Sequence, residues 1–137
     1  MRSARWWLGL AEGDLAGARA LLSHEGCPPR LAAYLAHQAA EKALKAAVAV
    51  SGTDPARTHD LLGLRASAAA EVREALPAKA LQLLGSVEVV GRYPERNSEL
   101  IDQPGSDAIV ADAAHVVEII CAVFETVAPA VGLVEAR

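Results

Sequence analysis

The chain has few aromatic side chains, few cysteines and no excess of positive charge. Aromatic residues make up 4% of its 137 residues, which leaves few of the stacking surfaces that single-strand nucleic-acid binders use. The formal net charge is −4, whereas sequence-independent phosphate binding needs clustered Lys and Arg. These features argue against a general nucleic-acid binder, while a local basic pocket stays compatible with them.

Long uncharged apolar runs are also missing. Segment 108–124 comes closest to one, but Asp112, His115 and Glu118 interrupt it. The basic start of the chain is followed by glycine and acidic residues rather than by an apolar run, which argues against a signal peptide. We therefore expect no membrane span and a cytoplasmic protein.

Metal, cofactor and nucleophile motifs are absent from the sequence. Cys27 and Cys121 lack CxxC spacing, and in a cytoplasmic chain we predict two free thiols. The histidines share no ligand-like spacing, and a pair such as His37 with Glu41 lacks a third ligand. There is no GxSxG, GxxxxGK[ST] or GxGxxG motif. We expect neither a metal nor a cofactor.

What the sequence does contain is apolar residues, above all alanine, at helical spacing. The hydrophobic fraction is 53%, enough for one domain with a sizeable core. Periodicity and breakers predict an all-α protein with these helices: 4–24, 28–50, a short one capped by Thr58 or Asp60 through about 75, 77–90, and one beginning near Asp107 with Ser106 as its cap. For residues 87–90 a strand is an alternative, although no partner strand is evident.

Two helix faces carry packing information. Gly9, Gly13 and Gly17 follow each other at four-residue spacing, which predicts a groove that admits a neighbouring helix. One face of segment 28–50 is nearly all alanine and should pack closely against another helix. The opposite face is polar: Arg30, Tyr34, His37, Gln38, Glu41 and Lys45. On physical grounds alone, segment 38–45 of this face is expected to be a solvated stripe rather than a site, with Glu41 and Lys45 as a favourable i, i+4 pair.

Two further groups of residues have both a structural and a functional interpretation. Structurally, Thr58 or Asp60 caps a helix while His59 hydrogen-bonds a neighbouring one; functionally, His59 and Arg92 form a phosphate or general-base pocket. In Arg92-Tyr93-Pro94-Glu95, the proline forces Tyr93 out of the helical region and Arg92 suits a helix C-terminus. The functional alternative uses Arg92 as a bidentate anion ligand.

Taken together, four motifs resemble those of the HEPN domain family: Asp14-Leu15, Gln38-Ala-Ala-Glu-Lys-Ala-Leu-Lys-Ala46, Thr58-His-Asp-Leu61 and Arg92-Tyr-Pro-Glu95. The resemblance covers nearly the whole chain. It implies a single HEPN-like domain over residues 1–137, built as an antiparallel up-and-down bundle of four to five helices. It also implies a homodimer, in a family often encoded beside a minimal nucleotidyltransferase as a two-component pair.

Some members of the family are ribonucleases or toxins of such pairs, with an Arg-x(4–6)-His motif that meets across the dimer. Here no histidine follows Arg92 or Arg96 within that range. Arg30 and His37 do have six residues between them, but they lie at the start of the second helix, away from the family's nuclease motif. The departure argues against ribonuclease activity.

Three functional hypotheses follow. In the first, the protein is a non-catalytic accessory partner that binds a nucleotide or another anion. Positive charge then comes from Lys42, Lys45, His59 and Arg92; Gln38 and Glu41 orient these groups, and Tyr93 covers a base or packs the loop. In the second, Arg30 with His37, or His59 with Arg92, forms a metal-independent ribonuclease across a dimer interface. In the third, the chain is a purely structural interaction module. Net acidity and scarce aromatics favour the first and third over RNA binding.

Overall fold

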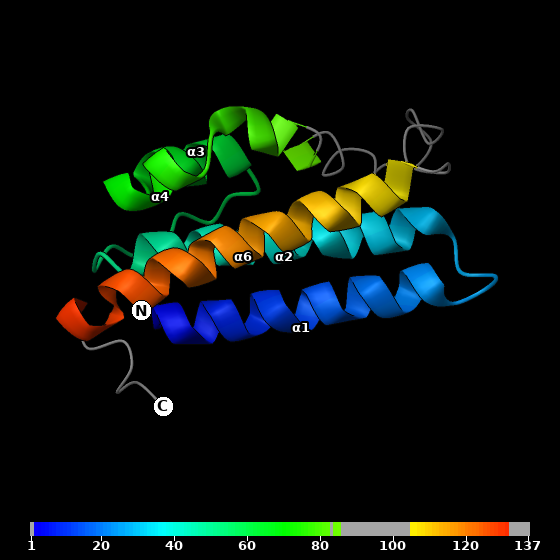
Figure 1. Cartoon of the computed structure of the whole chain (residues 1–137), viewed down its shortest axis with the longest axis horizontal. Helices are drawn as coiled ribbons and strands as arrows, with labels where there is room; N and C mark the ends of the chain where they lie inside the picture. Colours follow the sequence, from blue (N-terminus) through cyan, green and yellow to red (C-terminus); the bar gives the residue numbers. More distant parts are fainter. Residues whose placement is uncertain (1, 83, 86–104, 132–137) are drawn as a thin grey trace.

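The computed structural model describes residues 2–82, 84–85 and 105–131 and shows a bundle of helices (Figure 1). The elements are α1 (Ala4–Ser23), α2 (Pro29–Ala49), α3 (Leu61–Ser67), α4 (Ala70–Ala75), the 3₁₀ helix η1 (Ala78–Leu81) and α6 (Gly105–Val131). Within those ranges the chain forms no strand. The predicted all-α bundle is therefore confirmed.

Helix α2 occupies the centre of the bundle. It packs against α1, α6 and α3, while α6 also touches α1 and α4 (Figure 1). Helix α1 runs opposite to α2 and α6, and the short helices α3 and α4 lie on the side of α2 and α6 away from α1. Because α2 has neighbours on several sides, its polar face has little room to reach solvent.

Local sequence signals explain how the two N-terminal helices begin and end. The hydroxyl of Ser3 accepts a hydrogen bond from the backbone N–H of Trp6 at 3.0 Å and so caps α1. Pro29 occupies the first turn of α2, where a missing N–H costs no helical hydrogen bond. Gly26 and Gly52 follow α1 and α2 with φ of 89°, a conformation that glycine adopts without steric cost.

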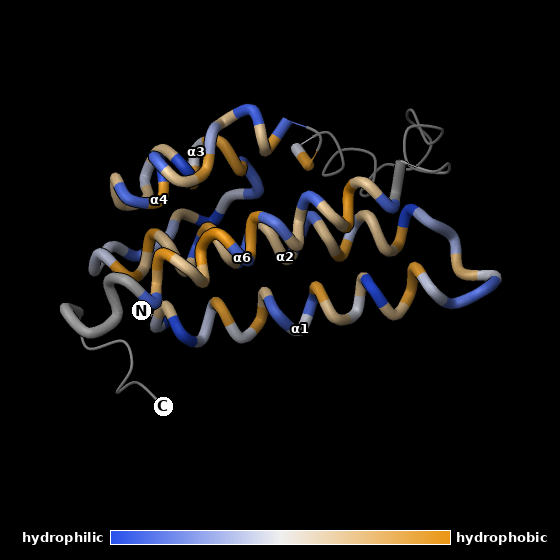
Figure 2. Tube along the Cα trace, in the orientation of Figure 1, coloured by the Kyte–Doolittle hydropathy of each residue, from blue (hydrophilic) through white to orange (hydrophobic). Residues whose placement is uncertain are grey.

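The core combines small side chains on α2 with large ones on α6. The predicted alanine face is buried; for example, Ala36, Ala39 and Ala43 are all 0% exposed. Alanine loses no side-chain entropy on burial and lets helix axes approach closely. Helix α6 supplies apolar bulk such as Ile109 and Ile120, and hydrophobic colour is concentrated along it (Figure 2). None of the described helices has the combination of length and apolar character that crossing a bilayer requires.

The structure divides the helix predicted to end near residue 75. Ala68 and Ala69 are extended, with ψ of 166° and 152°, so α3 and α4 are separate helices. Arg65 holds this bend: its Nε donates to the carbonyl of Leu76 at 2.6 Å, and its Nη2 donates to that of Arg73 at 2.9 Å. A side chain that bonds distant carbonyls leaves no trace in hydrophobic periodicity.

Other predicted boundaries also change. Segment 77–90 begins as η1, with Gln82, Leu84 and Gly85 helical; the strand alternative at 87–90 lies outside the described residues. Helix α6 begins at Gly105, so Ser106 lies within the helix rather than at its cap. Asp60 does precede α3 at the N-cap position, but its side chain makes no capping hydrogen bond.

The predicted glycine groove is wrong for two of its three members. A Cβ added at Gly9 or Gly13 would meet nothing within 4 Å, whereas one at Gly17 would lie 3.3 Å from Leu35 Cδ1. Only Gly17 therefore admits a neighbouring helix. Besides the charged Glu12 and Arg19, helix α1 exposes several uncharged residues, six of which we call the α1 outer strip: Trp6, Gly9, Leu10, Gly13, Ala16 and Ala20.

Candidate functional site

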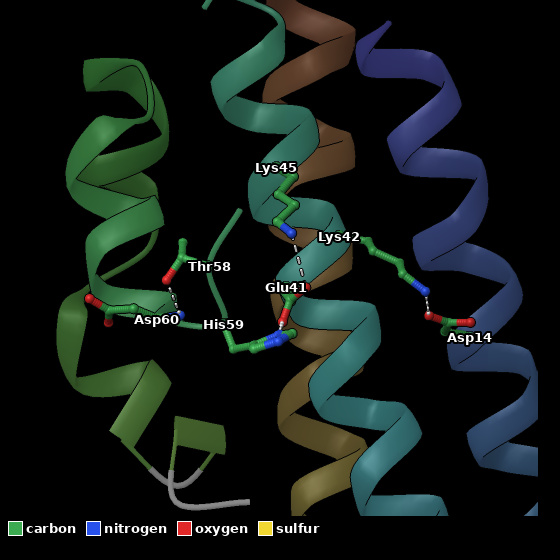
Figure 3. A network of polar contacts seen from close by, with 7 residues as sticks. All are labelled: Asp14, Glu41, Lys42, Lys45, Thr58, His59 and Asp60. Carbon is green, nitrogen blue, oxygen red and sulfur yellow. Dashed lines mark hydrogen bonds and ion pairs between the residues drawn. The ribbon is translucent and has the colours of Figure 1, made fainter. Parts of the chain in front are cut away.

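A buried polar network forms where the loop before α3 meets the middle of α2 (Figure 3). Glu41 of α2 is its centre, with a side chain only 4% exposed. One carboxylate oxygen, Oε2, accepts from Lys45 Nζ at 3.2 Å, and the other, Oε1, lies 2.7 Å from His59 Nδ1. We call these three residues the Glu41 network.

The prediction of a solvated polar stripe on α2 is wrong for Glu41 and Lys45, which are 3% and 9% exposed. His37, on the same face of the helix, is 0% exposed. The physical reason is tertiary: α1, α3 and the chain after α2 cover a face that an isolated amphipathic helix would leave in water. A buried charge is tolerated when it is paired and hydrogen-bonded, and Glu41 uses both of its oxygens for that purpose.

Lys45 is held from two directions. Its ammonium group contacts Glu41 one helical turn earlier and lies 5.2 Å from the ring centroid of Trp7 on α1. A cation over an aromatic face is attracted by the negative face of the ring. Trp7 is thus a member of the site that motif comparison alone did not suggest, because its position is fixed by the packing of α1 on α2.

His59 joins the network from the loop. Its predicted hydrogen bond to a neighbouring helix is confirmed by the contact with Glu41 on α2. The backbone N–H of Asp60 donates to Thr58 Oγ1 at 3.1 Å, which fixes the local turn. The side chain of His59 remains 44% exposed and lines a pocket of 520 Å³. A histidine oriented by a carboxylate is the arrangement that proton transfer uses.

The other predicted ligand residues do not join this network. Lys42 points toward α1, where its Nζ lies 2.5 Å from Asp14 Oδ2 (Figure 3). Gln38 is half-buried on α2. Arg92 and Tyr93 lie outside the described residues. The predicted set is therefore divided: Glu41, Lys45 and His59 meet, and Lys42 stabilises the α1–α2 contact instead.

The alternative catalytic pair is poorly placed for a substrate. His37 is 0% exposed within the bundle, and Arg30 is half-buried in the first turn of α2. A general base must come within hydrogen-bond distance of the proton that it removes. In this arrangement RNA has no route to the imidazole of His37.

The cysteines are free thiols, as predicted. Burial raises the pKa of the Cys121 thiol, and the nearby carboxylates of Glu12, Glu125 and Glu118 raise it further. A raised pKa keeps the thiol protonated and makes it a poor nucleophile. Among the residues that the structure describes, no three His, Cys, Asp or Glu side chains gather in a way that could hold a metal ion.

Comparison with known proteins adds one finding to this geometry. A family model described as HEPN domain matches residues 4–127. The match begins at the first residue of α1 and runs into the last turns of α6. No curated protein and no solved structure gives a significant match to the chain.

Proposed function

Because the chain belongs to the HEPN domain family, we propose that it is a non-catalytic accessory protein. In this proposal one HEPN domain spans residues 1–137, forms a homodimer and partners a minimal nucleotidyltransferase in the cytoplasm. The protein also binds a nucleotide or another anion. The family membership and the organisation of the polar residues support the proposal.

The observation that carries the non-catalytic part is the burial of Glu41, Lys45 and His37. Both oxygens of Glu41 are engaged by side chains of the same chain, and Lys45 and His37 have little or no exposure. Groups in this state hold helices and a loop together. They are badly placed to exchange protons with a substrate.

The α1 outer strip supports the binding part. Trp6 is 41% and Leu10 36% exposed, and glycine or alanine occupies the other four positions of the strip. In a two-fold, antiparallel pairing of two α1 helices centred on Gly13, Trp6 faces Ala20 and Leu10 faces Ala16. Each large side chain then meets a small one, the complementarity that close helix packing requires.

The test is a tagged purification from native cells, with mass spectrometry of the co-purifying proteins and light scattering of the eluted complex. We expect a stoichiometric small nucleotidyltransferase and two copies of this chain. A monomeric protein that elutes alone would contradict the proposal. A Trp6→Ala variant, which removes the largest side chain of the α1 outer strip, should elute as a monomer.

A second candidate function rests on one specific contact. His59 is oriented by Glu41 and is partly exposed at a pocket, so a metal-independent ribonuclease that uses His59, with Arg92 as its partner, is the alternative. The 2′-hydroxyl proton would pass to His59, and arginine would stabilise the charge on the phosphate. This alternative requires RNA cleavage that persists in chelator and disappears in His59→Ala but not in Arg30→Ala.

A further inference from the structure

A second pocket, separate from the one beside His59, lies at the end of the bundle where α1 begins and α2 ends. It has a volume of 490 Å³, within the range of small-molecule sites. Its charged and aromatic lining residues come from three parts of the chain. Arg2, Trp6 and Trp7 come from the N-terminal part, Lys45 from α2, and Asp54 and Arg57 from the loop after α2.

The charge of this pocket is opposite to that of the protein. Three cationic side chains, Arg2, Lys45 and Arg57, line it together with one carboxylate, Asp54. The chain as a whole carries a net charge of −4. Lys45 is already paired with Glu41, so the two arginines supply most of the uncompensated positive charge. Cations concentrated in a concave site of an acidic protein favour an anionic ligand.

Aromatic rings hold the cations in place. The guanidinium carbon of Arg2 lies 4.7 Å from the ring centroid of Trp6, and Lys45 lies over Trp7. The two indoles pack edge to face at 5.0 Å. A guanidinium that already rests on an aromatic face loses less freedom on binding than one in open solvent, because part of its ordering has occurred beforehand.

We propose that this pocket binds the phosphate group of a small phosphorylated molecule, with Arg2 and Arg57 as its ligands. Each guanidinium offers a planar pair of donors that matches two phosphate oxygens. Trp6 lines the same pocket and lies against Arg2, so it helps to orient that guanidinium. The proposal gives the anion-binding part of the proposed function a location, and rests on that part alone. It shares only Lys45 with the residues that the sequence suggested.

Tryptophan fluorescence of the isolated protein tests this directly, since both tryptophans of the chain line the pocket. Inorganic phosphate and AMP are titrated separately, and calorimetry repeats each titration. Arg57→Ala and Arg2→Ala should each weaken binding at least about tenfold, because a single charge-assisted hydrogen bond already contributes that factor and each arginine offers a pair of donors. Asp54→Asn should strengthen it. Arg19→Ala removes the same charge from an exposed position of α1 outside the pocket, and should leave binding unchanged.

The two ligands distinguish the source of the phosphate. If AMP binds at least about tenfold more tightly than phosphate, the ligand of the pocket is a nucleoside phosphate. If the two bind equally well, the ligand is free phosphate. Either result supports an anion-binding pocket. The proposal is overturned if tryptophan fluorescence and calorimetry show no binding of either ligand up to about 10 mM. It is also overturned if Arg19→Ala weakens binding as much as the pocket variants do, because the effect would then come from the overall charge of the protein. The measurement needs no partner protein. A failed co-purification therefore leaves it standing, and its own failure leaves the accessory role standing.

Discussion

Glu41→Gln is the substitution that most directly tests whether the Glu41 network is a structural clamp. The change preserves side-chain size but removes the negative charge between Lys45 and His59. The side chains of Glu41 and Lys45 are 4% and 11% exposed, so the ammonium left behind has little water to replace its partner. Breaking a buried pair on one side costs about 3–5 kcal/mol, and we expect the lower end because the glutamine carbonyl still accepts a hydrogen bond.

Asp14→Asn is the matched control. It also converts a lysine-paired carboxylate to an amide, but its pair with Lys42 is 22% and 24% exposed. A pair of this exposure contributes about 1 kcal/mol or less. The two variants thus have the same chemistry and differ in burial.

Urea unfolding followed by far-UV circular dichroism measures both variants at one fixed protein concentration. With a slope of about 1.5 kcal/mol/M, Glu41→Gln should lower the unfolding midpoint by about 2 M, and Asp14→Asn by well under 1 M. Equal shifts in the two variants would refute the argument, because burial would then not decide what the carboxylate contributes.

Three further outcomes follow from the structure. Gly13→Ala should stabilise the isolated fold by about 0.5–1 kcal/mol, because alanine favours the helix and the new methyl group meets nothing within 4 Å. The same methyl group should weaken dimerisation through the α1 outer strip. Lower stability in urea, or an unchanged dimer by light scattering, would contradict this. Arg65→Ala should cost about 1–2 kcal/mol and speed hydrogen exchange in α4, since the bond to the Leu76 carbonyl is lost; unchanged exchange would show that the bend does not depend on it. The alkylation rate of Cys121, followed by mass spectrometry, should rise with pH later than that of free cysteine, because the folded thiol has a raised pKa. Glu12→Gln removes one of the carboxylates that raise that pKa, so the profile should move to lower pH while burial keeps it above that of free cysteine; an identical profile would rule out the electrostatic contribution.

The sequence predicted the long helices well because their signals are local. Alanine periodicity located α2, and the extent of α1 agreed to one residue. The bend at Ala68 could not be predicted in this way, since it is held by Arg65 bonding to carbonyls in and after α4. Hydrophobic periodicity describes the faces of one helix and carries no information about side chains that hydrogen-bond to another helix.

Three of the predicted ligand residues, Glu41, Lys45 and His59, contact one another, while their role as ligands stays a prediction. The burial of Glu41 and Lys45 was not predicted, because a helical wheel does not show what covers each face. The role of Lys42 depended on Asp14, a residue of another helix. Contacts between distant parts of the chain arise from the fold as a whole.

The order of the helices along the chain has a consequence for synthesis. Helices α1 and α2 are neighbours in sequence and in space, so this hairpin can form as soon as both have left the ribosome. Helix α6 is made after both of them, yet it packs against α2 and buries Ile109 and Ile120. Until it arrives, the nascent hairpin exposes an apolar surface of the kind that chaperones recognise. We therefore expect ribosome-bound chains that stop before residue 105 to be held by chaperones, and chains that include α6 to be released from them.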